Sequence, residues 1–215
     1  MHIPDGFLTT NTLVPTWIIS VGGIAYCLKK ATQALKERIV PLMGVMAAFI
    51  FAAQMLNFPV VGGTSGHLVG GVLAAVLLGP YAGAVAVTVV LIAQCLIFQD
   101  GGLTTLGANI LNMSLVGALG GYLIYSVVRK TISGNRGIVV ASALAAWISI
   151  VVSSSLCAVE LALSGTSPLK IALPAMAGAH MLIGIGEAVI TSLVIGFILK
   201  VRPDLIYGQE QRQYG

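Results

Sequence analysis

The segment Leu173–Leu199 reads LPAMAGAHMLIGIGEAVITSLVIGFIL, and its only ionisable side chains are those of His180 and Glu187. An α-helix needs roughly 20 mainly apolar residues to cross the hydrocarbon core of a bilayer. The segment is long enough, and it lacks the strict polar–apolar alternation of a transmembrane β-strand. It therefore predicts a membrane-spanning helix.

The composition of the whole chain points the same way. Of the 215 residues, 57% are hydrophobic and 8% are charged, and the mean hydropathy is +0.99. Soluble domains carry about 25% charged residues, and disordered chains have few apolar ones. Both classes are therefore excluded. The 26 glycines favour close packing of helices, as in membrane bundles.

Similar apolar runs recur along the chain, and we interpret seven of them as spans of an all-α membrane bundle. They are Leu13–Leu28, Val40–Phe58, His67–Leu78, Tyr81–Phe98, Leu106–Val128, Ile138–Leu163 and Leu173–Leu199. No basic region precedes an apolar core at the N-terminus, so we expect no cleavable signal sequence. The predicted organisation is a single transmembrane domain over 1–215, with an external N-terminal segment 1–12, a bundle 13–199 and a short cytoplasmic tail 200–215.

The positions of the basic residues predict the orientation of this bundle. Of the 11 lysines and arginines, all except Lys170 follow the first, fifth or seventh predicted span. The positive-inside rule makes that side cytoplasmic. Seven spans then require an external N-terminus and a cytoplasmic C-terminus. The net charge of +4 is explained by this topology, and no nucleic-acid partner is expected. The residues are Lys29, Lys30, Lys36, Arg38, Arg129, Lys130, Arg136, Lys200, Arg202 and Arg212.

The three histidines are functional candidates, because polar groups within or beside membrane spans are costly. His2 lies in the external N-terminal segment, and His67 ends an external loop rich in glycine. His180 lies in the last span on the same helical face as Glu187, seven residues on. All three can converge near the outer half of the bundle.

His2 offers a specific chemistry because it follows a free N-terminal amine. The Met1 amine, the deprotonated His2 amide and the His2 imidazole can chelate a metal in fused rings, and His67 supplies the fourth nitrogen. Square-planar nitrogen coordination selects Cu(II) or Ni(II) and disfavours zinc. The structural alternatives are a polar residue at a frayed terminus for His2 and an interfacial helix-start residue for His67.

Further polar residues can surround such a site. Asp5, Ser65 and Asn109 are candidates for holding the ligands, although Asn109 also suits a hydrogen bond between helices. His180 with Glu187 can orient a ligand, relay protons or form a structural polar pair. Asp5, Asp100 and Glu187 also make the outer half negative, a field suited to a divalent cation.

Four motifs resemble the CbiM/NikM family, the substrate-binding membrane components of energy-coupling-factor (ECF) transporters for nickel and cobalt. They are MHIPDGFL at 1–8, GGTSGHLVGG at 62–71, FQDGGLTTLGAN at 98–109 and AHMLIGIGEA at 179–188. The resemblance covers essentially the whole chain. It implies a seven-helix bundle in a prokaryotic cell membrane, with the metal bound by Met1, His2 and His67.

The resemblance also implies partners. A transmembrane coupling protein, two cytoplasmic ABC-type ATPases and a small accessory membrane protein are expected. The chain contains no Gly-x-x-x-x-Gly-Lys-Ser/Thr phosphate loop, so we expect neither an ATP site nor an enzyme. Ala48 and Ala52, four residues apart, are candidates for contact with the coupling protein or for packing within the bundle. The four-nitrogen plane favours Ni(II) as substrate, with Co(II) as the alternative.

Two other classes of function fit part of the sequence. A proton-coupled secondary metal transporter would use Glu160 and Glu187 and would need no ATPase. Gly63-Thr64-Ser65-Gly66 followed by His180 resembles the rhomboid proteases, in which a serine attacks with histidine as base. The protease reading leaves Met1 and His2 unexplained, and the Trp-Arg loop motif of rhomboids is absent.

Overall fold

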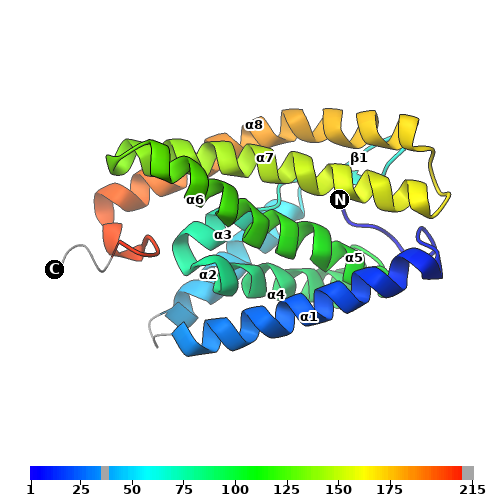
Figure 1. The fold of residues 1–215 in the computed structure, drawn as a ribbon, viewed down its shortest axis with the longest axis horizontal. Coiled ribbons are helices and arrows are strands. Elements are labelled where there is room, and N and C mark those ends of the chain that lie inside the picture. The colour runs from blue at the N-terminus through cyan, green and yellow to red at the C-terminus, as the bar shows by residue number, and fades with distance from the viewer. Residues whose placement is uncertain (35–38, 210–215) are drawn as a thin grey trace.

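The computed structural model describes residues 1–34 and 39–209, and nearly all regular structure in them is helical (Figure 1). Its elements are α1 (Thr10–Ala34), α2 (Ile39–Gln54), β1 (Phe58–Pro59), β2 (Ser65–Gly66), α3 (Gly71–Leu78), α4 (Pro80–Phe98), α5 (Leu106–Ile110), the π-helix η1 (Leu111–Gly120), α6 (Gly121–Thr131), α7 (Gly134–Leu163), α8 (Leu169–Val201) and the 3-10 turn η2 (Pro203–Leu205).

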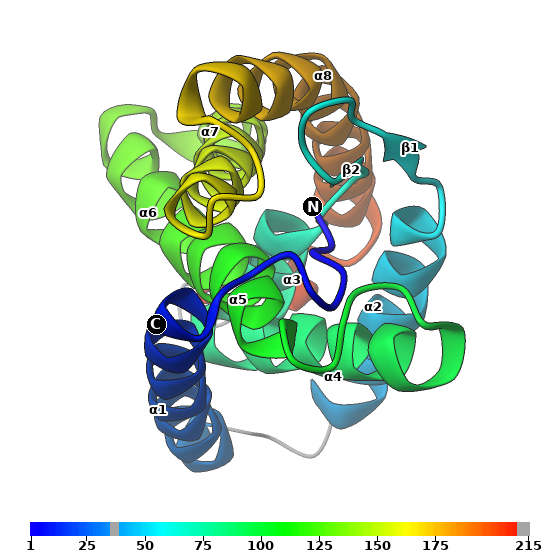
Figure 2. The ribbon, with the colours of Figure 1, turned by 90° about the vertical axis from the view of Figure 1, so that its right-hand side faces the viewer.

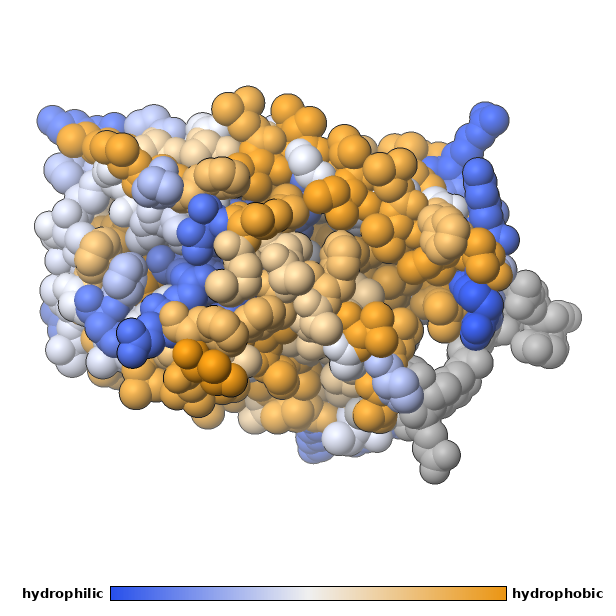
Figure 3. Space-filling view, turned by 180° about the vertical axis from the view of Figure 1, so that it is seen from behind, coloured by the Kyte–Doolittle hydropathy of each residue, from blue (hydrophilic) through white to orange (hydrophobic). Residues whose placement is uncertain are grey.

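Five helical segments of the described chain are long and apolar enough to cross a membrane. They are Thr10–Gln33, Pro80–Phe98, Leu106–Thr131, Gly134–Leu163 and Leu169–Val201. The third of these joins α5, η1 and α6 into one continuous helical segment. Apolar side chains cover the middle of the surface seen in Figure 3, and hydrophilic ones gather toward its two ends. This belt is the surface that a bilayer requires.

Two of the seven predicted spans are shorter as helices than the sequence suggested. α2 has 16 residues and ends at Gln54, before the predicted end at Phe58. α3 has only 8 residues and begins at Gly71, after a loop that contains His67. Gly70 has a positive φ of 72°, and the Gly79–Pro80 pair ends the helix. All eight α3 residues are buried, so α3 is an internal half-helix, and seven complete spans remain a prediction.

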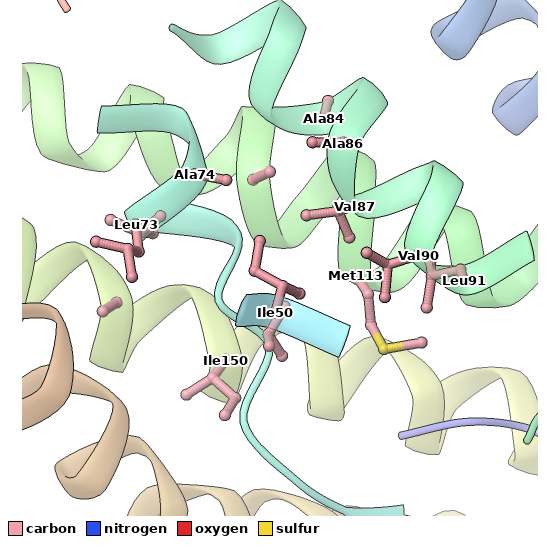
Figure 4. Packing of buried hydrophobic residues seen from close by; sticks show 14 of the residues in the cluster. Ile50, Leu73, Ala74, Ala84, Ala86, Val87, Val90, Leu91, Met113 and Ile150 are labelled. Atoms are coloured by element: carbon pink, nitrogen blue, oxygen red, sulfur yellow. The ribbon is translucent and has the colours of Figure 1, made fainter. Parts of the chain in front are cut away.

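The core surrounds α3. Leu73 of α3 packs in the same cluster as Ile50 of α2, Val87 of α4 and Met113 of η1 (Figure 4). Glycine allows the closest approaches: a Cβ atom on Gly83 would lie 2.7 Å from the Ala75 Cα atom. These backbone contacts between helices are the packing that the glycine content predicted.

Helices α1, α6 and α8 all end at the same end of the molecule (Figure 1). Lys30, Arg129 and Lys200 therefore lie at that end, whereas the N-terminal residues lie toward the other. The predicted clustering of cations on one side is consistent with this arrangement. The assignment of that side to the cytoplasm remains a prediction. Lys36, Arg38 and Arg212 lie outside the described residues.

Candidate metal centre

The first seven residues, here called the N-terminal strap (Met1–Phe7), run into the bundle rather than away from it. Figure 2 shows the N-terminus among α2, α5, α7, α8 and the short β1–β2 hairpin. Met1 and Ile3 are fully buried. The polar N-terminal residues therefore do not form a frayed tail.

The strap is held by the turn and helix that follow α4. The Ile3 amide donates to Asn109 Oδ1 at 2.8 Å, and the Ile3 carbonyl accepts from the amide of Gly102 at 2.9 Å and from the Thr105 hydroxyl. Asp5 accepts from the amides of Leu103 and Thr104. The Thr104 hydroxyl also donates to Asp5, and these hydrogen bonds lower the pKa of the Asp5 carboxyl. Asp5 and Asn109 thus position the strap.

The Met1 amine is held by Ser65 of β2. It donates to the Ser65 carbonyl and, at 2.9 Å, to the Ser65 hydroxyl. The His2 amide donates to the same hydroxyl at 3.2 Å. β1 and β2 pair antiparallel, with Pro59 opposite Ser65, and this hairpin fixes the position of the serine. The short hairpin was not expected from the sequence. It brings the first two nitrogens of the chain to one side chain.

The His2 ring lies between three groups. Its Nε2 is 3.1 Å from Gln94 Oε1, a contact that favours a proton on Nε2. Its Nδ1 has no hydrogen-bond partner among the described residues and lies 3.4 Å from Asp100 Oδ1. The ring also stacks on that of His67, with centroids 4.5 Å apart and planes inclined by 26°. The nitrogen required for the predicted chelate is therefore the one left free.

His67 also has one occupied and one free ring nitrogen. Its Nδ1 lies 2.7 Å from the Leu68 carbonyl, so Nδ1 carries the proton. Its buried Nε2 hydrogen-bonds to nothing in the described chain. Beyond Leu68, the amides of Val69 and Gly70 donate to the Glu187 carboxylate at 2.7 and 2.9 Å. Glu187 of α8 thereby holds the loop that carries His67.

His180 lies beside this loop and is fully buried. Its Nδ1 is bonded to the Met176 carbonyl at 2.7 Å, and its Nε2 is unpartnered within residues 1–34 and 39–209. A Cβ atom on Gly66 would lie 3.8 Å from His180 Cε1. The structure thus places His180 next to the His67 loop.

Burial keeps the candidate nitrogens unprotonated. Loss of solvation lowers the pKa of the Met1 amine to about 5. Burial, followed by the charge of that amine, lowers the pKa of His2 to about 3. The same causes hold the pKa of His67 well below its ordinary value. At neutral pH these groups carry the free lone pairs that a metal ion needs.

The side chains alone do not make a metal site. No group of three His, Cys, Asp or Glu side chains in the described chain is arranged to hold a metal ion. The arrangement can bind a transition metal only if backbone nitrogens join the two imidazoles. The Met1 amine and His2 amide, both at Ser65, are the nitrogens in the right place.

The predicted site set left out two residues that touch His2. Gln94 could have been singled out from the sequence, because its amide side chain interrupts the largely apolar helix α4. Asp100 could be named from the sequence only as one of the acidic residues of the outer half, because its contact with His2 depends on the turn after α4.

The remaining predicted residues lie elsewhere or pair differently. Ala48 and Ala52 are exposed on α2, which favours contact with a partner or lipid over packing within the bundle. Ser65 bonds to Met1 and His2, and its hydroxyl makes no hydrogen bond to His180 in the described structure. The serine–histidine pair of a protease is therefore not formed.

The comparisons with known proteins agree with one another. The family CbiM, described as the cobalt uptake substrate-specific transmembrane region, matches residues 2–205. A relative from Archaeoglobus fulgidus is 43% identical over 96% of this chain and 68% of its own length. The fused nickel transport protein NikMN of Rhodobacter capsulatus is 35% identical over 96% of this chain and 64% of its own length.

A solved structure shares the fold. The crystal structure of a truncated transition metal transporter is 35% identical, with a TM-score of 0.88, over 93% of this chain and 99% of that one. The five apolar helices and the family match together identify a membrane protein. The chain belongs to the CbiM family, the substrate-specific transmembrane region of cobalt uptake systems.

Proposed function

We propose that this protein is the substrate-binding component of an ECF-type ABC importer for transition-metal ions in a prokaryotic cell membrane. Ni(II) binds through four nitrogens: the Met1 amine, the His2 amide, His2 Nδ1 and His67 Nε2. The observation that carries this proposal is a pair of buried imidazole nitrogens, at His2 and His67, that have no hydrogen-bond partner in residues 1–34 and 39–209 and lie beside a buried N-terminal amine.

The chemistry of this donor set favours nickel. Four nitrogens in a plane suit Cu(II) and Ni(II), and one of the relatives is a nickel transport protein. Co(II) usually takes more ligands, which makes it the alternative substrate. The His2 amide must lose its proton to coordinate, so binding releases protons. Its present acceptor, the Ser65 hydroxyl, would then have to turn or be displaced.

The proposed partners are those that the resemblance to ECF transporters implies. They are a coupling membrane protein and two cytoplasmic ABC-type ATPases that supply the energy, with a small accessory membrane protein; this chain has no phosphate loop for ATP. The exposed Ala48 and Ala52 on α2 offer a face on which the helix of a coupling protein can approach closely.

The N-terminal amine provides the sharpest test of the site. A glycine placed before Met1 keeps every side chain but displaces the amine and moves His2 to the third position. We expect Ni(II) affinity to fall by more than the roughly 10–100-fold that outer-shell changes cost. A glycine added after Gly215 is the matched control. Isothermal titration on untagged protein measures both, and intact mass establishes that Met1 is the free N-terminus.

Unchanged affinity in the N-terminally extended protein would rule out the proposed chelate. Energy coupling is tested separately in vesicles that contain the protein with or without the coupling protein and ATPases. Accumulation of Ni(II) only with the ATPases and ATP supports an importer component. Accumulation without them, driven by a proton gradient, favours the secondary carrier.

A further inference from the structure

The turn between α4 and α5 has an unusual backbone next to the strap. Gln99 has a φ of 55°, the only positive φ of a non-glycine residue in the described chain, and Gly101 has a φ of 88°. Left-handed non-glycine residues are uncommon and occur often at functional sites. This turn places the Asp100 carboxylate beside His2 Nδ1.

The Asp100 carboxylate is close enough to His2 to share a metal ion with it. Oδ1 is 3.4 Å from His2 Nδ1, and Oδ2 accepts a hydrogen bond from Asn57 at 3.4 Å. Metal bonds of about 2.1 Å to a nitrogen and an oxygen at a right angle hold the two atoms about 3.0 Å apart. The observed distance is only slightly longer, so neither side chain needs to move far.

Asp100 also lies on the side of the site that solvent can reach. Its side chain is 18% exposed, whereas that of His2 is 3% exposed. Met1 is fully buried, and His67 is almost so. A hydrated cation that arrives from solution therefore meets the Asp100 carboxylate before it meets a nitrogen of the proposed site.

We infer that Asp100 is the entry ligand of this site: its carboxylate captures the hydrated divalent cation and then releases it to His2 Nδ1 and the other nitrogens. This inference rests on the proposed function. A negative carboxylate at the entrance raises the association rate through its field.

The test uses three substitutions at one position. Asp100→Asn keeps the size but removes the charge, Asp100→Ala removes the donor, and Asp100→Glu retains a carboxylate. Stopped-flow mixing with Ni(II) gives association rates, and equilibrium titration with Ni(II) gives affinity. Asp204→Asn removes a carboxylate in η2, at the other end of the molecule, and is the control.

For Asp100→Asn we expect association to slow by about 10-fold or more, with a smaller change in Ni(II) affinity, because the carboxylate releases the ion to the nitrogens. Asp100→Glu should recover much of the rate. An association rate within twofold of the unsubstituted protein in both Asp100→Asn and Asp100→Ala would overturn the entry role.

The two levels of inference fail in different ways. If the unsubstituted protein binds neither Ni(II) nor Co(II), or if N-terminal extension leaves binding unchanged, the proposed function fails. If the unsubstituted protein binds and N-terminal extension abolishes binding, but the Asp100 variants bind at the ordinary rate, only the role of Asp100 fails. A thermal unfolding midpoint for each variant separates loss of binding from loss of fold.

Discussion

At the scale of single residues, each of the three histidines has one nitrogen fixed and one free. Backbone carbonyls hold Nδ1 of His67 and of His180, and Gln94 holds Nε2 of His2. A hydrogen bond at one ring nitrogen determines which tautomer is present and directs the other nitrogen. The free nitrogens are therefore a consequence of fixed neighbours. The same effect explains why Gln94 matters despite its distance from the chain terminus.

Gly102 is the residue at which the strap can be displaced without changing any proposed ligand. A Cβ atom there would lie 2.3 Å from the Asp5 amide nitrogen, too close for any real contact. We expect Gly102→Ala to push the strap outward and reduce Ni(II) affinity by about 10–100-fold, the usual effect of lost ligand support. Titration with Ni(II) measures this effect.

Gly22→Ala is the control for Gly102→Ala, because a Cβ atom on Gly22 meets nothing within 4 Å. It should bind Ni(II) normally. If Gly102→Ala also binds with ordinary affinity, then close seating of the strap against the α4–α5 turn is not required for the site.

At the scale of elements, the sequence predicted where helices lie better than how long they are. The long apolar runs of α4, α7 and α8 are recognisable because length and hydropathy are local properties. The third run, His67–Leu78, is already short in the sequence, but the start of α3 at Gly71 was not predicted, because it follows from Gly70 and from burial among α2, α4 and η1. The β1–β2 hairpin was missed because two residues per strand leave no periodic pattern.

The candidate site was predictable in a similar, partial way. Met1, His2 and His67 could be chosen from the sequence, because their chelating chemistry follows from residue type and from position along the chain. Asp100 and Gln94 could not be assigned, because their contacts to His2 depend on how the α4–α5 turn folds back over the strap. Local chemistry gave the proposed ligands, and long-range contacts gave their neighbours.

Substitutions on the exposed face of α2 should separate metal binding from energy-coupled transport. Leucine at Ala48 and Ala52 enlarges an exposed helix surface without touching the buried site. If the coupling protein packs on this face, the double substitution should leave Ni(II) affinity unchanged and reduce ATP-dependent uptake in vesicles by about 10-fold or more, since closely packed small residues tolerate bulk poorly.

Ala25→Leu on the exposed face of α1 is the matched control for the α2 substitutions. Uptake should be ordinary in that variant. Ordinary uptake by the doubly substituted α2 protein would show that the coupling protein contacts another surface.

At the scale of the whole molecule, the bundle has two chemically different ends. The strap, the turn between α4 and α5 that carries Asp100, and the β1–β2 hairpin that leads into the His67 loop lie toward one end, and the ends of α1, α6 and α8 carry cations at the other (Figure 1). By the positive-inside rule we predict that the site lies in the outer half of the membrane. A metal ion would approach from outside and leave toward the cation-rich end.

Orientation can be measured with single introduced cysteines. Asn11 begins α1 near the strap, Asn135 begins α7 at the opposite end, and both are exposed. We expect a membrane-impermeant thiol reagent to label Asn11→Cys in intact cells and Asn135→Cys only after lysis. The three native cysteines are buried and give a low background. The reverse pattern would place the site at the cytoplasmic face.

The buried N-terminus also imposes an order on biosynthesis. The strap is synthesised before the residues that hold it, because its contacts come from Ser65, Gln94, Asn109 and Thr166, which all lie later in the sequence. The strap residues are therefore among the last to reach their final position. Until the chain has been synthesised as far as the start of α8, the residues that hold the strap are not all present. The metal site can therefore form only after most of the bundle has been inserted.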